Sequence, residues 1–174
     1  MHALLHLPSN IKAAIWSHLL QAGDESEAAA FAFVKHEQQD GDFRFDYLEW
    51  YAVPEEGFAV HTGYHIELTD ETRAIVIKRA HDLDASLVEF HSHLGPWPAA
   101  FSRSDEAGLA EFVPHARWRL RGRPYLALVA TPRDYDGLVW IAKSANPERL
   151  DGIVLDESVL PPTGLSSLEY GNDQ

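Results

Sequence analysis

Two histidines separated by one residue, His91 and His93, have the spacing in this sequence that best suits metal chemistry. His91 ends the segment 86–91 (SLVEFH), whose apolar composition predicts a β-strand. In an extended strand, residues two apart project to the same side, about 7 Å apart along the chain. Two imidazoles on one side suit a single zinc ion. The other eight histidines have no ligand-like neighbours and are expected to be ordinary surface or core residues: His2, His6, His18, His36, His61, His65, His81 and His115.

A third ligand is available in Asp105, at the start of a predicted helix that Ser102 begins. A carboxylate in the first turn of a helix is favoured by the helix dipole. A glycine and two prolines make residues 94–101 a stiff, turned connection that can bring Asp105 back over the histidines. Two histidines and one carboxylate leave a position of a tetrahedral zinc ion open, as in catalytic sites.

Each half of this pattern also has a simpler interpretation. A His-x-His sequence is common by chance, and a serine three residues before an acid at the start of a helix is a capping arrangement. The two halves become specific when they occur in order, after an apolar strand and before a helix.

Joined in this way, His91-x-His93 and Ser102-x-x-Asp105 resemble the signature of the JAMM (JAB1/MPN/Mov34) metalloprotease family. That signature is a glutamate, a long gap, His-Ser/Thr-His, seven residues, then Ser-x-x-Asp. This chain has eight residues between His93 and Ser102, and Leu94 stands where a proline commonly follows the second histidine. The resemblance implies one domain over residues 1–174, of the compact prokaryotic JAB type. Its expected fold is α/β: a three-layer α/β/α, cytidine-deaminase-like sandwich with a mixed central sheet.

The resemblance also requires an upstream glutamate that opens the first core strand. Glu27, at the start of the segment 27–34 (EAAAFAFV), fits this description best, and Glu25 is its nearest competitor. The remaining candidates fit less well: Glu37, Glu49 and Glu89. Of these, Glu89 shares the side of its strand with His91 and could interact with the metal ligands, but it is not expected to be the base.

By the same resemblance, zinc bound by the two histidines and Asp105 would make hydroxide available near neutral pH. Glu27 would act as general base and then general acid, an effect of about 10²–10⁴-fold. Ser102 would donate a hydrogen bond to the oxyanion, or would only cap its helix.

The expected activity is hydrolysis of a peptide or isopeptide bond at the C-terminus of a ubiquitin-like protein, with an activating or conjugating enzyme as a possible associate. A narrow channel under Trp97 and Phe101 would suit such a terminus, although both aromatics could equally fill the core. Two alternatives stay open. The enzyme could release a small adduct from a sulfur-carrier protein, or the chain could be a non-catalytic MPN scaffold.

Strands and helices that alternate along the chain must position these residues, which favours a sheet with helices packed on it. Helices are predicted at 11–20 with Ser9 as cap, from Thr69 or Asp70 to about 83, and at 105–113, ended by Pro114. Strands are predicted at 27–34, 43–50, 64–68, 86–91, 125–131 and 138–143, with a hairpin at Asp40-Gly41. The tail from Pro161 is expected to be an edge strand or frayed.

Composition narrows the functional classes. The chain has 174 residues and no cysteine, which excludes thiol catalysis, iron–sulfur clusters and cysteine-ligated zinc. Its net charge of −13 disfavours nucleic acid and anionic membranes as partners. The arginine-rich segment 117–123 is expected to be the solvent side of a strand or loop. No apolar run has the length of a membrane span, and a cytoplasmic location is expected.

Overall fold

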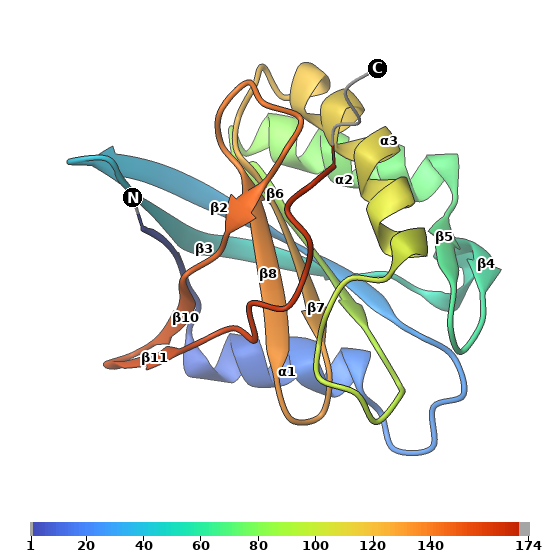
Figure 1. Ribbon diagram of the computed structural model, residues 1–174. Helices are drawn as coiled ribbons and strands as arrows, with labels where there is room; N and C mark the ends of the chain where they lie inside the picture. Colours follow the sequence, from blue (N-terminus) through green and yellow to red (C-terminus); the bar gives the residue numbers. More distant parts are fainter. Residues whose placement is uncertain (1, 171–174) are drawn as a thin grey trace.

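The computed structural model describes residues 2–170, and nine strands among them form one mixed sheet (Figure 1). The strand order is β11-β10-β1-β3-β2-β6-β7-β8-β9. Their bounds are β1 Ala3–His6, β2 Ala29–Gln39, β3 Asp42–Ala52, β6 Ser86–Ser92, β7 Tyr125–Ala130, β8 Tyr135–Trp140, β9 Glu148–Arg149, β10 Gly152–Leu155 and β11 Ser158–Leu160. β1 is parallel to β3 and β10, and β6 is parallel to β7. The other neighbouring pairs are antiparallel.

Helices cover both faces of this sheet. α1 (Ser9–Leu19) lies on one face, and α2 (Asp70–Asp82) and α3 (Arg103–Arg119) lie on the other (Figure 1). The alternation of β2 explains the arrangement. Phe31 and Phe33 belong to the core cluster that includes α2 and α3, whereas Ala30 and Ala32 belong to the cluster that includes α1. The prediction of an α/β fold is confirmed.

A short excursion separates β3 from α2. It contains the 3₁₀ turn Glu55–Gly57 and a two-stranded sheet of β4 (Phe58–His61) and β5 (Ile66–Leu68). Thr69 caps α2, since its hydroxyl accepts the backbone N–H of Thr72 at 3.1 Å. The predicted hairpin between β2 and β3 is present. Asp40 and Gly41 both have positive φ, 54° and 84°, as a tight two-residue turn requires.

Two predictions about helix ends are wrong. Ser9 does not cap α1, because it lies within the first turn and its hydroxyl donates to Asp156 at 2.7 Å. Pro114 does not end α3, which continues to Arg119. Pro114 is exposed, whereas the neighbouring Ala116 is fully buried, so the packing of α3 against the sheet outweighs the loss of one backbone hydrogen bond. As a result, the segment 117–123 is the end of a helix and a turn, and not a strand.

The two ends of the chain also differ from the predictions. β1 was not predicted as a strand, yet it lies between β3 and β10 and is half buried. The edge strand expected after Pro161 does not form: residues 161–170 contain no strand, and the edge is β11, just before them. The tail is nevertheless held, because Asp136 accepts backbone N–H groups from Gly164 and Ser166 at 3.0 and 2.9 Å. Among residues 2–170, no helix has the length and apolarity needed to cross a membrane.

Candidate metal centre

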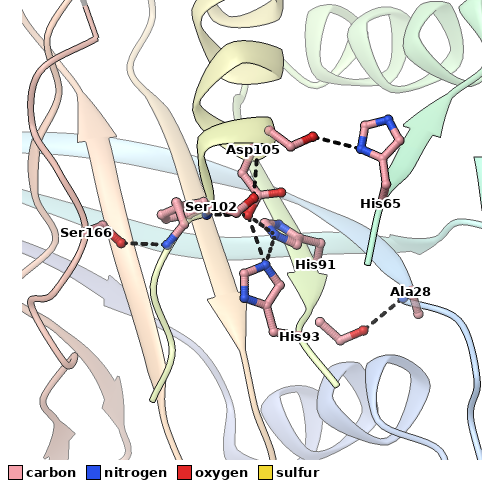
Figure 2. A network of polar contacts seen from close by, with 10 residues as sticks. Ala28, His65, His91, His93, Ser102, Asp105 and Ser166 are labelled. Carbon is pink, nitrogen blue, oxygen red and sulfur yellow. Dashed lines mark hydrogen bonds and ion pairs between the residues drawn. The ribbon is translucent and has the colours of Figure 1, made fainter. Parts of the chain in front are cut away.

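β6 positions the two histidines. It lies between β2 and β7, so hydrogen bonds on both sides fix its backbone. His91 is the sixth residue of the strand, and His93 follows its last residue and donates its backbone N–H to Ala130 at 2.9 Å. The Nε2 atoms of the two rings are 3.2 Å apart, so both side chains project to the same side, as predicted (Figure 2).

Asp105 completes a three-atom group. Its Oδ2 lies 2.9 Å from Nε2 of His93 and 3.2 Å from Nε2 of His91. Zinc binds nitrogen and oxygen at about 2.0–2.1 Å, so two ligand atoms at corners of a tetrahedron lie about 3.3 Å apart. The observed separations are close to this value. His91 is buried, and the other two are partly buried. The group can hold a metal ion.

Capping of α3 places Asp105. The Oγ atom of Ser102 accepts the backbone N–H of Asp105 at 3.1 Å, and Asp105 Oδ2 accepts the backbone N–H of Ser102 at 2.8 Å. This reciprocal pair is a capping box, so the predicted capping role of Ser102 is confirmed. One carboxylate oxygen therefore serves both the helix and the histidines.

The charges within the group reinforce one another. Burial lowers the pKa of His91, but Asp105, Glu89 and Glu27 together outweigh burial and raise that pKa to about 9 in the metal-free protein. Burial acts to raise the pKa of Asp105, but His91 and His93 outweigh burial and hold this pKa far below its usual range. The aspartate is therefore ionised, as a metal ligand must be.

Glu27 lies within electrostatic reach of this group. Its backbone N–H donates to Thr62 at 2.8 Å, and its carbonyl is bonded by Nε2 of His61 at 2.6 Å, which fixes the chain just before β2. Glu27 is 4% exposed. Burial raises the pKa of its carboxyl, and the charges of His91 and His93 partly oppose the shift. The carboxyl thus senses both histidines but is not one of the three ligands.

The other glutamates considered lie in different surroundings. Glu25 and Glu37 are exposed, and Glu49 is bound by an arginine of α2. Glu89 is on the side of β6 that carries His91, as predicted, and accepts a hydrogen bond from Tyr125 at 2.8 Å. Burial raises the pKa of Glu89. The structure thus places Glu27, among these candidates, just before β2 and in the field of both histidines.

Sequence reasoning did not find the role of Ser92. This fully buried residue lies between the histidines and faces the other way. Its Oγ accepts the backbone N–H of Ala28 at 2.8 Å, the dashed line at Ala28 in Figure 2. The backbone N–H of Ser92 also donates to the carbonyl of Ala28, at 3.0 Å. Ser92 therefore joins the strand that carries the histidines to the residue after Glu27. The period of two along the strand was the available signal.

The two aromatic residues of the connection 94–101, whose roles the sequence left open, lie in different surroundings. Phe101 is buried, with its ring centroid 5.5 Å from that of His91, whereas Trp97 is 74% exposed. The backbone N–H of Phe101 donates to Oγ of Ser166 at 2.9 Å, so the C-terminal segment supports this connection (Figure 2). Phe101 is a core residue, and Trp97 is free to contact a ligand.

A cavity of about 400 Å³ opens beside the metal group, between β5 and α3. His91, Asp105 and Glu89 lie in its wall. His65, which sequence reasoning set aside, also lines it, and its Nδ1 is 2.8 Å from Oγ of Ser104 (Figure 2). This contact joins the residue before β5 to the first turn of α3. No local pattern in the sequence identifies this pairing, because the two residues are far apart in the chain.

Comparison with known proteins adds no assignment: no family model matches the chain, and no curated protein matches it.

Proposed function

We propose that the protein is a zinc-dependent peptidase or isopeptidase that cleaves the bond at the C-terminus of a ubiquitin-like protein. One observation carries the proposal. His91, His93 and Asp105 bring their ligand atoms to 2.9–3.2 Å from one another, and the buried Glu27 lies within electrostatic reach of all three. This is the residue set that the resemblance to the JAMM family implies.

The donor set favours zinc among common metal ions. Two imidazoles and one carboxylate are typical of catalytic zinc, whereas magnesium and calcium prefer oxygen ligands. Three protein ligands leave a position for water or substrate. When bound, zinc would supply Lewis acidity, which polarises a carbonyl group and acidifies water.

Glu27 would hold and move the proton. Because burial raises the pKa of its carboxyl, Glu27 is a stronger base than an exposed glutamate. It would accept a proton from the attacking water and return it to the leaving amine. The backbone contacts of Glu27 with Thr62 and His61 limit how far the carboxyl can move.

Ser102 would stabilise the oxyanion. Its Oγ accepts a hydrogen bond from Asp105, and this capping role leaves the hydroxyl hydrogen free to donate. Ser102 is also exposed, so a substrate can reach it. Capping and oxyanion stabilisation are therefore compatible.

An extended substrate chain would lie in the cavity between β5 and α3. Within residues 2–170, β5 pairs with β4 on one side only, so its other edge can bond an added strand. Trp97 would contact the substrate on the side of the connection 94–101. Backbone hydrogen bonds would provide affinity, and the narrow site would favour small residues at the cleaved bond.

The test uses purified protein loaded with zinc and two probes, a fluorogenic C-terminal amide of ubiquitin and a sulfur-carrier protein with a C-terminal amino-acid adduct. Glu27→Gln is expected to retain about one zinc per chain and to lose at least about 100-fold in kcat. Glu25→Gln, a change at an exposed residue nearby, is the control. Full activity of Glu27→Gln would refute the role of Glu27, and failure of the wild-type protein to bind zinc would refute the proposal as a whole.

A further inference from the structure

A second cavity, of about 870 Å³, lies between the C-terminal half of α3 and the segment 140–145, which begins at the last residue of β8. Its lining shares Leu109 alone with the cavity of the metal centre. This volume is within the range of about 300–1,000 Å³ that holds small-molecule ligands. The cavity is therefore distinct from the proposed active site and large enough for a ligand of its own.

Aromatic side chains form much of its wall. Trp118, on α3, is 75% exposed. Trp140 is 3% exposed, and its ring packs edge-on against Tyr170 with centroids 5.5 Å apart. The Nε1–H of Trp140 donates to the carbonyl of Ala145 at 3.1 Å, which folds the segment 140–145 over the ring. The wall thus has a fixed part and one free indole that can stack on a ligand.

The charge of the lining is opposite to that of the whole chain. Arg117, Arg121 and Lys143 line the cavity, and no Asp or Glu is among its described lining residues, although the chain has 27 acidic and 14 basic residues. Within residues 2–170, the side chains of Arg121 and Lys143 form no hydrogen bond or ion pair. These two cations are available to a ligand.

The third cation, Arg117, has a structural role in the cavity wall. The guanidinium of Arg117 donates to backbone carbonyls, among them Ala142 at 2.7 Å and Ile141 at 2.9 Å, and no carboxylate of residues 2–170 pairs with it. These bonds hold the segment after β8 against α3. After burial, the charge of Glu106 adds most to the raised pKa of Tyr170, but Glu106 does not line the cavity. Among the described lining residues, no acidic side chain offsets this positive charge.

We propose that this cavity is a binding site for a small anionic molecule with an aromatic or apolar body. The body would stack on Trp118 and fill the apolar space beside Trp140, and the anionic group would lie between Arg121 and Lys143. A partly desolvated contact of this kind is a charge-assisted hydrogen bond. The site is independent of the metal centre, so the proposal does not rest on the proposed hydrolysis.

The test compares two fluorescent probes that share a body and differ in charge. Anilinonaphthalene sulfonate carries an anion, and N-phenyl-1-naphthylamine does not. Arg121→Glu and Lys143→Glu are expected to weaken binding of the sulfonate by about tenfold each and to leave the neutral probe unchanged. Trp118→Ala is expected to weaken both. Arg119→Glu is the matched control, because Arg119 lies two positions before Arg121, is exposed and does not line this cavity.

Three results would overturn the proposal. The first is sulfonate binding that Trp118→Ala does not weaken. The second is an equal effect of Arg119→Glu and Lys143→Glu, which would indicate non-specific attraction to surface charge. The third is tighter binding after removal of residues 171–174, which would assign the cavity to the chain's own last residues. Thermal unfolding of each variant would identify changes that act through loss of the fold.

Discussion

Ser102 and Asp105 are bonded in both directions at the start of α3, with the Ser102 backbone N–H donating to Oδ2 at 2.8 Å and the Asp105 backbone N–H donating to Oγ at 3.1 Å. The same Oδ2 is 2.9 Å from Nε2 of His93. Formation of the helix therefore places the carboxylate for the histidines. A metal bound at this group would in turn stabilise the first turn of α3, because ligand binding to the folded state adds to its stability.

The first prediction concerns the charge of this carboxylate. Asp105→Asn keeps an oxygen for the cap but removes the negative charge, and zinc affinity is expected to fall by more than about 100-fold, the upper limit for loss of a merely supporting residue. Competition with a chromophoric chelator measures the affinity. Glu106→Gln, one position along the helix, is expected to bind zinc like the wild type. Unchanged affinity in Asp105→Asn would contradict the ligand assignment.

The second prediction separates two buried serines of β6. Ser92→Ala leaves the N–H of Ala28 without its side-chain acceptor and is expected to lower the free energy of unfolding by about 1–3 kcal/mol. The loss also loosens the segment that holds Glu27, so kcat is expected to fall more than KM rises. Ser86 is equally buried, but its Oγ has no hydrogen-bond partner within residues 2–170, so Ser86→Ala is expected to cost little. Equal effects of the two changes on unfolding by urea would refute the role given to Ser92.

Local sequence patterns predicted the features of the fold that depend on interactions between residues close together in the chain. The alternation of β6 predicted that His91 and His93 share a side, and the Ser-x-x-Asp spacing predicted the cap of α3. The hairpin at Asp40-Gly41 followed from the turn preference of those residue types. In each case the deciding interaction lies within a few residues of the pattern that predicts it.

Other features depend on contacts between distant segments and could not be predicted. β1 forms a strand because it pairs with β3 on one side and β10 on the other. Its four residues are too few to show a strand pattern by themselves. α3 continues past Pro114 because its buried face packs on the sheet. The tail joins the site through Ser166 and Phe101, which are 65 positions apart. The local sequence around each partner contains no signal for such pairs.

The third prediction tests this distant support. Ser166 is buried and accepts the N–H of Phe101, the residue before the cap of α3. Ser166→Ala leaves that N–H unpaired, and the free energy of unfolding is expected to fall by about 1–3 kcal/mol, with weaker zinc binding because the connection to Asp105 is less restrained. Ser167→Ala, at an exposed neighbour that bonds Glu169, is the control. Unfolding in urea and a zinc titration measure the two effects, and wild-type values in Ser166→Ala would refute the support.

The last prediction follows from the pKa of His91. Without bound metal, the acidic neighbours of His91, chiefly Asp105, outweigh burial and raise this pKa to about 9 in the folded protein, against 6.5 for an ordinary histidine. A raised folded pKa stabilises the protein fully below 6.5 and loses its effect as the pH rises through about 9, a change on the order of 3 kcal/mol. The free energy of unfolding of the chelated protein is therefore expected to decrease between pH 6 and pH 9.5. His91→Gln is expected to flatten this dependence, and His115→Gln, at an exposed histidine, to retain it. Zinc requires the neutral imidazole, so zinc affinity is expected to increase over the same range; a chelated protein whose stability rises with pH would contradict the pairing of His91 with Asp105.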